Sequence, residues 1–392
     1  MNERVAIVGI GQSRCGYNMD GLNHKELLYL TTKQALEDAG IERERIDSAF
    51  TVSLDFNEGR SLSNQYSLDA IGGVMKSCDL RLGEDGVYGI FAGYMEVVRK
   101  PPRIVVAASV QKASDRNPNA DAAVMLSEQD IAYTWQVCAN VPNRNGLEYC
   151  LAAMEARRYM HCYGITEEQI AKVAVKNYNN AIRNPLAQNA KEISVNDILN
   201  SGVLSWPLRS LMVAQPSDGA CTLILAPEEI ATELTDKPIW IKGIGWCSET
   251  CYPATSELAS ARFIRAAARQ AYDMAGIKHP AKEIDLAEVY DSYAFNELQY
   301  CEALGLCGEG EAGKAIDKGI FEIGGSIPVN PSGGLLGHGN PLGTAGLMRV
   351  AQAALQLRGE AGDYQIPNAE IAVVQGCQWP YRSGGVVVLS KS

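Results

Sequence analysis

The sequence predicts an α/β fold made of two similar halves, and three observations lead to this prediction. Segments with the residue spacing of strands alternate with segments with the spacing of helices along the 392 residues. Residues 33–41, KQALEDAGI, are matched without a gap by RQAYDMAGI at residues 269–277. The segment IDSAFTVS, which begins at Ile46, parallels IDLAEVYDS, which begins at Ile284. Duplication of one βαβα-type unit explains both matches.

The first half contains the expected elements in a regular order. Residues 4–10, RVAIVGI, are rich in β-branched side chains, as is typical of a buried strand. An amphipathic helix is expected over residues 25–39, where Gly40 ends it, and a strand is expected over residues 46–54. A helix that begins at Gly83 then precedes the strand RIVVAASV. The nearby Gly-rich segment GIGQSRCG does not have GxGxxG spacing, so we expect no dinucleotide site there.

The second half repeats this order. A strand is expected over residues 238–245, PIWIKGIG, and a helix over residues 340–358 precedes the strand AEIAVVQG. Alternating strands and helices predict mostly parallel sheets covered by helices. The first half is therefore assigned to residues 1–114 and 220–237, and the second half to residues 238–392.

Residues 115–219 form an insertion that is not repeated. Helices are expected over residues 147–163 and 166–180, followed by an irregular segment rich in Asn and Pro at residues 184–205. A long insertion of this kind often forms a cap or a binding surface over a site.

The composition excludes several classes of protein. A formal net charge of −11 leaves no basic surplus for nucleic acid or anionic membranes. The N-terminus does not read as a signal peptide, and we find no apolar segment long enough to span a membrane. The eleven cysteines are scattered, which is typical of a reduced cytoplasmic protein. With four histidines and no CxxC pair, we expect no metal site.

A Gly- and Pro-rich stretch at residues 330–346, NPSGGLLGHGNPLGTAG, leads directly into the second-half helix. A Gly-rich loop at a helix N-terminus collects free backbone N–H groups, which can hold an anion or a developing oxyanion. It can also be a tight turn without such a role. The helix start at Gly83 is its counterpart in the first half, so the two helix starts can face each other across the pseudo-two-fold axis.

These segments resemble the thiolase superfamily, in the branch of sterol-carrier-protein-type and archaeal-type thiolases. The similarity covers nearly the whole chain and includes VAVKNYNNAIRNPLAQNAKEISVNDIL, QPSDGACTLILA and EVYDSYAFNELQYCEALGLCGEGEAG besides the Gly-rich stretch. The resemblance implies a five-layered αβαβα fold, dimers, and coenzyme A thioester substrates. It also implies Claisen condensation or its thiolytic reverse, with coenzyme A as a substrate and not a bound cofactor.

Such a reaction needs a thiolate nucleophile, an acid/base and oxyanion holes. At the positions that the resemblance implies, this sequence differs. The nucleophile position falls on Gly83, and the nearest thiol is Cys78. The family's GHP triplet reads GNP, so that Asn340 stands where a His is expected. The His-Asp-Cys-Phe loop reads YDSY from Tyr290, and Cys377 lies near a catalytic cysteine position.

The resemblance and the residues together yield three groups of candidates. Each has a structural alternative: a helix cap with Glu84 and Asp85, core aromatics, a loop histidine or a buried apolar cysteine. The candidates are Tyr290, Ser292, Asn340 and Cys377 for catalysis, Gly83, Gly86 and Gly376 for an oxyanion or thioester cradle, and Tyr293, His338 and Met212 for substrate binding.

Three functions remain open. The first is thiolase-type C–C bond formation or cleavage, on a bulky β-ketoacyl-CoA and with an atypical residue set. The second is retro-aldol cleavage of a β-hydroxyacyl-CoA, which needs no acyl-enzyme. The third is a non-catalytic subunit that keeps the coenzyme A channel. The resemblance also implies a homodimer core and a zinc-ribbon/OB-fold companion subunit, as in the steroid aldolases and the benzoylsuccinyl-CoA thiolase of anaerobic aromatic catabolism.

Overall fold

The computed structural model describes residues 4–19, 21–54, 67–99, 101, 103–115, 146–250, 252, 255–378 and 382–392. The first half comprises β1 (Val5–Gln12), α1 (His24–Ala39), β2 (Ser48–Val52), β3 (Cys78–Leu82), α3 (Val87–Val97), β4 (Val105–Lys112), β7 (Asp218–Pro227) and α9 (Glu228–Leu234). The second half comprises β8 (Ile239–Ser248), α10 (Arg262–Ala275), α11 (Pro280–Glu283), β9 (Leu286–Glu288), α12 (Ala294–Ala303), α13 (Ala312–Asp317), α14 (Gly334–Gly337), α15 (Ala345–Arg358), β10 (Ile371–Gln378) and β11 (Ser383–Ser390).

The nine main strands form one continuous sheet in the order β3-β2-β4-β7-β1-β8-β11-β10-β9. The series β2-β4-β7-β1 in the first half is mirrored by β8-β11-β10-β9 in the second, as a two-fold duplication requires. The halves join where β1 pairs with β8, through Ala6 with Trp240 and Ile7 with Ile239. Ala6 and Trp240 occupy equivalent positions in the two repeats, so the pseudo-two-fold axis passes close to this pair.

The prediction of mostly parallel sheets is wrong. Strand β2 is parallel to β3 and β4, and β9 is parallel to β10, but the other neighbours in the nine-stranded sheet are antiparallel. The cause is the last strand of each half. Strands β7 and β11 insert between the first strand of their half and the parallel pair, and each runs antiparallel to both neighbours.

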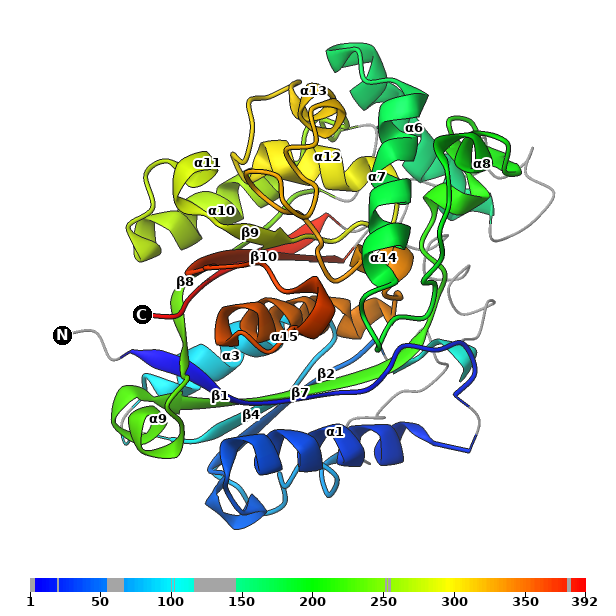
Figure 1. Ribbon diagram of the computed structural model, residues 1–392. Coiled ribbons are helices and arrows are strands. Elements are labelled where there is room, and N and C mark those ends of the chain that lie inside the picture. The colour runs from blue at the N-terminus through cyan, green and yellow to red at the C-terminus, as the bar shows by residue number, and fades with distance from the viewer. Residues whose placement is uncertain are drawn as a thin grey trace.

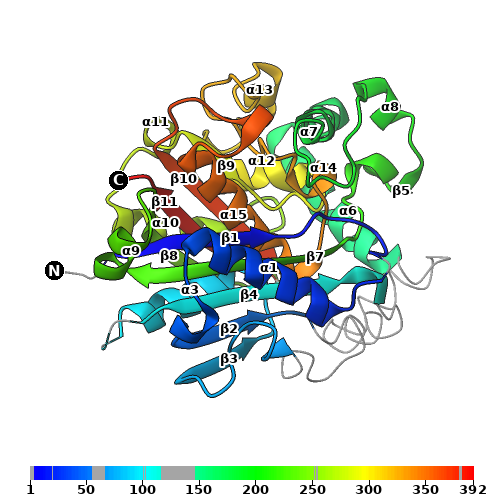
Figure 2. The ribbon, with the colours of Figure 1, turned by 60° about the horizontal axis from the view of Figure 1, so that its bottom comes forward.

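The helices and the sheet form the expected five layers (Figure 1). Helices α3 and α15 lie together between the two parts of the sheet, in one apolar core that includes Phe91 and Leu347. Helix α1 covers the outer face of the first-half strands, whereas α10 and α12 cover the outer face of the second-half strands. Figure 2 shows α1 lying across the strands of its own half.

The repeated GIG sequence has a packing role in both halves. A Cβ atom on Gly9 would lie 2.2 Å from the Ala35 carbonyl oxygen, and one on Gly243 would lie 2.0 Å from the Ala271 carbonyl oxygen. Only glycine permits a helix backbone to approach a strand so closely. The glycines therefore bring α1 onto β1 and α10 onto β8, which explains their presence without a nucleotide.

The insertion provides a separate group of helices beside the Gly-rich stretch. Both predicted helices are present, and α7 packs against α14, where the Asn177 carbonyl oxygen leaves no room for a Cβ atom on Gly337. Residues 116–145 of the insertion lie outside the described residues. Within the described part of the chain, no helix is long and apolar enough to cross a membrane. The insertion's elements are α6 (Gly146–Tyr163), α7 (Glu167–Ala181), α8 (Val195–Leu199), β5 (Val203–Ser205) and β6 (Leu208–Arg209).

Candidate active site

The N-termini of α3 and α15 meet at one buried carboxyl group, that of Asp85. Its Oδ1 accepts a hydrogen bond of 3.0 Å from the Val87 amide at the start of α3, and its Oδ2 accepts one of 3.0 Å from the Gly346 amide in the first turn of α15. The two helix starts that the duplication predicts to face each other are thus joined through a side chain of the chain itself. Asp85 is only 1% exposed.

Glycines make the space that the Asp85 carboxyl group occupies. Cβ atoms on Gly346 and Gly376 would lie 1.8 Å and 2.3 Å from its Oδ1. Burial raises the pKa of Asp85 to about 7, although backbone hydrogen bonds from Val87 and Gly346 act in the opposite direction. The carboxyl group therefore titrates in the neutral range of pH.

Tyr290 and Cys377 lie next to this carboxyl group. Tyr290 follows β9, and its amide donates a 2.9 Å hydrogen bond to Oε1 of Gln375 on β10. Burial raises the pKa of Tyr290 well above its usual value, and the Asp85 charge is the largest neighbouring charge acting in the same direction. Burial also raises the pKa of the Cys377 thiol, whose Sγ accepts a 3.6 Å hydrogen bond from the Tyr300 hydroxyl.

An extended segment at residues 213–217 connects the remaining candidates. Val213 pairs with Tyr293, and the Ala214 amide donates a 2.8 Å hydrogen bond to the Ser292 carbonyl oxygen. Three residues further along, the Asn340 amide donates a 2.9 Å hydrogen bond to Oγ of Ser217. Met212, which is fully buried, ends the 3-10 turn (Ser210–Met212) that precedes the segment. The structure therefore places the YDSY loop and the GNP triplet on either end of one short segment.

The side-chain amide of Asn340 has a fixed orientation. Its Oδ1 accepts a 3.2 Å hydrogen bond from the Leu342 amide. Among the described residues, no hydrogen bond involves Nδ2. Asn340 is thus a neutral donor, which can hydrogen-bond a carbonyl or enolate oxygen but cannot transfer a proton in the way a histidine does.

The insertion also reaches these residues, through the first turn of α6. Glu148 Oε1 accepts a 3.3 Å hydrogen bond from the Tyr293 hydroxyl, and its charge contributes to the raised pKa values of Tyr293 and Tyr290, in which burial is the main cause. Through this contact the insertion packs against the YDSY loop.

A buried polar network fixes the rest of the Gly-rich stretch. Asp291 accepts hydrogen bonds from the Leu335 amide and from Nδ2 of Asn177, and burial followed by the charge of Glu297 raises its pKa to about 7. Glu297 in turn forms an ion pair of 3.1 Å with Lys176, and both side chains are inaccessible to solvent. This network holds the start of α14 in place.

Two candidates and one alternative nucleophile lie apart from the group around Asp85. Gly83 is exposed, and a Cβ atom there would have open space around it. His338 is fully buried, and its Nδ1 contacts the Arg349 guanidinium, while burial lowers its pKa well below the usual value. Cys78 begins β3, the edge strand of the sheet.

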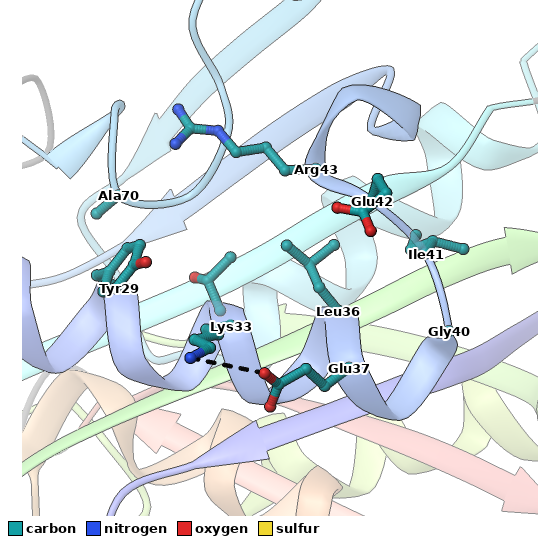
Figure 3. Close-up of a pocket in the computed structure, with 10 residues that line it drawn as sticks. Tyr29, Lys33, Leu36, Glu37, Gly40, Ile41, Glu42, Arg43 and Ala70 are labelled. Carbon is teal, nitrogen blue, oxygen red and sulfur yellow. Dashed lines mark ion pairs between the residues drawn. The ribbon is translucent and has the colours of Figure 1, made fainter.

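Surface cavities offer space for other ligands away from Asp85. One of about 520 Å³ lies on the outer side of α1, between Tyr29, Leu36 and Arg43, where Lys33 and Glu37 form an exposed ion pair (Figure 3). None of the predicted site residues lines it. The described ranges contain no cluster of three or more His, Cys, Asp or Glu side chains suited to a metal ion.

Sequence reasoning missed the central position of Asp85 and the contribution of Glu148. Two acidic residues before the apolar helix gave a signal for a helix cap at Asp85, but its other partners, Gly346 and Gly376, are far away in the sequence. Glu148 gave no signal, because only the packing of the insertion brings α6 to Tyr293.

Comparison with known proteins identifies the family. Residues 5–202 match the model for the thiolase N-terminal domain, and residues 248–391 match the model for the thiolase C-terminal domain-like family. The acetyl-CoA acetyltransferase of Methanothermobacter thermautotrophicus is 34% identical over 379 residues, which is 94% of each chain. A solved structure described as "Ltp2-ChsH2(DUF35) aldolase" is 27% identical with a TM-score of 0.84, and the match covers 99% of this chain and 98% of that chain.

Two further relatives match over part of their length. Sterol carrier protein 2 of Bos taurus is 35% identical over 240 residues, which is 60% of this chain and 43% of that protein. The benzoylsuccinyl-CoA thiolase subunit BbsB of Thauera aromatica is 33% identical over 232 residues, which is 58% of this chain and 60% of that protein. The full-length matches and the duplicated five-layered fold lead to the same conclusion: the chain belongs to the thiolase family.

Proposed function

We propose that the chain makes or breaks a carbon–carbon bond next to the thioester carbonyl of an acyl-CoA. The observation that carries this proposal is the grouping of Tyr290, Cys377 and the Asn340 loop at the junction of the α3 and α15 helix starts. Proton transfer beside a thioester needs an acid/base and a donor for the enolate oxygen, and this group offers both. Membership in the thiolase family supports the same class of substrate.

A groove along α6 is suited to the nucleotide end of coenzyme A. Its volume is about 620 Å³, and Arg157, Arg158, His161 and Trp206 are among the residues that line it. The Arg157 guanidinium lies 5.3 Å above the Trp206 ring, which together offer a cation for phosphate and an aromatic face for a base. Arg157 lies about 14 Å along α6 from the Glu148 end, a separation that an extended pantetheine arm spans.

In the thiolase-type reaction, a thiolate takes the acyl group and coenzyme A then releases it. Cys377 is the candidate, because its charge acts on Tyr290 and the charge of Asp85 acts on it. Its raised pKa requires that a base remove the thiol proton at the moment of attack. The acetyl-CoA acetyltransferase relatives favour this reaction for the present chain.

The glycine at position 83 favours a second candidate, retro-aldol cleavage. This reaction needs no thiolate at the α3 helix start. A base removes the proton of the β-hydroxyl group, the Cα–Cβ bond breaks, and its electron pair forms the enolate of the acyl-CoA. Tyr290 is the proposed proton acceptor in its phenolate form, which its raised pKa makes a minor form of the free protein, and the phenol that results is the proposed donor to the α-carbon. Nδ2 of Asn340 is the proposed donor to the enolate oxygen. Protonation of the α-carbon gives the shortened acyl-CoA and a free aldehyde or ketone.

We further propose a homodimer core and a zinc-ribbon/OB-fold companion subunit. Strand β3 ends the sheet, and its residues are half-buried or exposed, so its outer edge is free to pair with a second copy within the described part of the chain. The companion subunit is supported by similarity to BbsB, which is itself named as a subunit, and to the DUF35-containing aldolase.

The test is an assay of the purified chain, alone and with its companion, on β-ketoacyl-CoA with free coenzyme A and on β-hydroxyacyl-CoA without it. Wild type is compared with Tyr290→Phe, Asn340→Ala and Cys377→Ser, and with Cys162→Ser as a control at an exposed thiol. Products are followed by chromatography, and acylated cysteines are sought by mass spectrometry.

The outcomes separate the alternatives. Turnover that requires free coenzyme A, with an acyl group on Cys377, supports the thiolase-type reaction. Cleavage of the β-hydroxy substrate that survives in Cys377→Ser and is lost in Tyr290→Phe supports the aldol reaction. Absence of turnover with the companion present, over a broad panel of acyl groups, contradicts the proposal and favours the non-catalytic subunit.

A further inference from the structure

We propose that Asp85 is the positioning residue of the site: its carboxyl group locks the helix starts of the two halves together and thereby sets the place and the protonation of Tyr290. This inference rests on the proposed function above and adds to it a residue and a pH dependence. Asp85 does not contact the reacting atoms in this scheme, so its role is to act through its neighbours.

The first argument is the meeting of two like charges. The N-terminus of a helix carries a partial positive charge, and in α3 and α15 two such ends are buried against each other. The amides of Val87 and Gly346, one from each helix, both donate to the Asp85 carboxyl group. Its negative charge therefore compensates both helix ends and satisfies N–H groups that have no partner within their helices.

The second argument is the shape of the space. A Cβ atom added to Gly346 or to Gly376 would lie 1.8 Å or 2.3 Å from Oδ1 of Asp85. The carboxyl group therefore fills the space that these glycines leave between α15 and β10. Cys377 follows Gly376 directly in the sequence, and the Tyr290 amide donates a hydrogen bond to the Gln375 side chain. A change at Asp85 is thus transmitted to the segment that positions both side chains.

The third argument concerns charge. The titratable groups that face Asp85 are Glu84 in its own loop, Tyr88 on α3, Tyr290 after β9 and Cys377 on β10. None of these groups is a cation, and α15 presents the uncharged Gly346 and Leu347 on this side. Among the described residues, the groups that stabilise the carboxylate are the backbone amides of Val87, Gly346 and Gly86.

The electrostatic consequence follows from this environment. Because burial raises the pKa of Asp85 to about 7, its charge changes within the physiological range of pH. The ionised form raises the pKa values of Tyr290 and Cys377 further than burial alone does. Protonation removes this effect and weakens the hydrogen bonds to the two helix starts. Activity is therefore expected to change around neutral pH through a group that never contacts substrate.

The test compares Asp85→Asn with Asp38→Asn in the full chain and its companion. Asp38 is a matched control, because Oδ2 of its carboxylate also accepts a backbone amide, that of Ile10, and joins the first half to Arg358 at the opposite end of α15. Asp85→Ser is a second variant, since a smaller side chain can cap α3 without a charge if the amide fails to fold.

We expect Asp85→Asn to lower kcat about 10- to 100-fold with KM changed less than threefold, because displacement of a reacting group reduces the rate of the chemical step. The limb of the kcat–pH profile near pH 7 should disappear in both Asp85 variants and persist in Asp38→Asn. A profile that keeps this limb in folded Asp85 variants, or a kcat equal to that of wild type, overturns the proposal.

A spectroscopic measurement tests the inference without turnover. The difference infrared spectrum of wild type minus an Asp85 variant should contain the C=O band of a protonated carboxyl group at pH 5.5, and this band should be lost by pH 8.5. A spectrum without this band at either pH overturns the proposal, whatever the activity. Wild type that has the band but turns over no acyl-CoA contradicts the proposed function separately.

Discussion

The buried ion pair between Lys176 and Glu297 permits a quantitative prediction. Neither side chain is accessible to solvent, and the nitrogen–oxygen distance is 3.1 Å. Lys176 Nζ also donates a 2.6 Å hydrogen bond to the Val329 carbonyl oxygen, just before the Gly-rich stretch, and Glu297 Oε2 accepts a 2.8 Å hydrogen bond from Asn330 Nδ2. Replacement of Lys176 by Met leaves the Glu297 carboxylate buried without its cation.

The expected cost of Lys176→Met is about 3–5 kcal/mol, because one partner of a buried pair is removed and the other remains charged. A chain of 392 residues has an unfolding entropy of about 0.8 kcal/mol per kelvin. A loss of about 4 kcal/mol therefore corresponds to a decrease in Tm of roughly 5 °C. Calorimetry measures this decrease directly.

The matched control is Lys237→Met, which removes the exposed pair of Lys237 with Glu360 at 2.9 Å and should cost no more than about 1 kcal/mol. The double variant Lys176→Met/Glu297→Gln removes both buried charges and retains an acceptor for Asn330. Its cost should fall short of the sum of the two single variants by about 1–3 kcal/mol. Strictly additive costs, or a decrease in Tm for Lys176→Met no larger than that of the exposed control, would refute the reasoning.

Other consequences of the structure are open to simple measurements. Gly243→Ala should cost about 3 kcal/mol or more in urea unfolding, because its Cβ would lie 2.0 Å from a carbonyl oxygen of α10, whereas Gly202→Ala, with open space around it, should stay within about 0.5 kcal/mol. Because the pKa of Asp85 is raised to about 7, its contribution to stability is present below pH 4 and is lost as the pH rises to 7. The free energy of unfolding of Asp85→Asn relative to wild type should therefore increase over this range, and a constant difference would contradict the raised pKa. Iodoacetamide at pH 8 should modify the exposed Cys162 of the native protein and leave Cys377 unmodified until urea is added, as peptide mass spectrometry can determine; equal labelling without urea would contradict the burial of Cys377.

Local periodicity and the internal repeat were sufficient to predict the main helices and the two-half architecture. They were not sufficient to predict strand direction. Strand β7 has the same apolar pattern as a parallel strand would have, and its antiparallel direction depends on the path of the insertion that precedes it. A buried strand is apolar on both faces in either direction, so periodicity does not distinguish the two.

Candidate residues that are adjacent in the sequence, as in the YDSY loop and the GNP triplet, could be grouped from the sequence alone. The site was not predictable where the partners come from distant segments. His338 illustrates the difference: it lies two residues from Asn340 in the sequence, yet its side chain is directed to Arg349 in the core, while Asn340 lies beside Ser217. Loop conformation at glycines with positive φ, such as Gly339 at 134°, sends adjacent side chains in opposite directions.

The duplication also explains why a single carboxyl group can serve two helices. A true homodimer of half-chains must place the same residue at both symmetric helix starts, so two carboxylates would meet at the axis and repel each other. Fusion into one polypeptide removes this constraint: the first turn of α15 contains no acidic residue, and Gly346 lies where the carboxyl group needs room. Covalent linkage thus permits an asymmetric contact at the pseudo-two-fold junction, where one carboxyl group is shared by both halves.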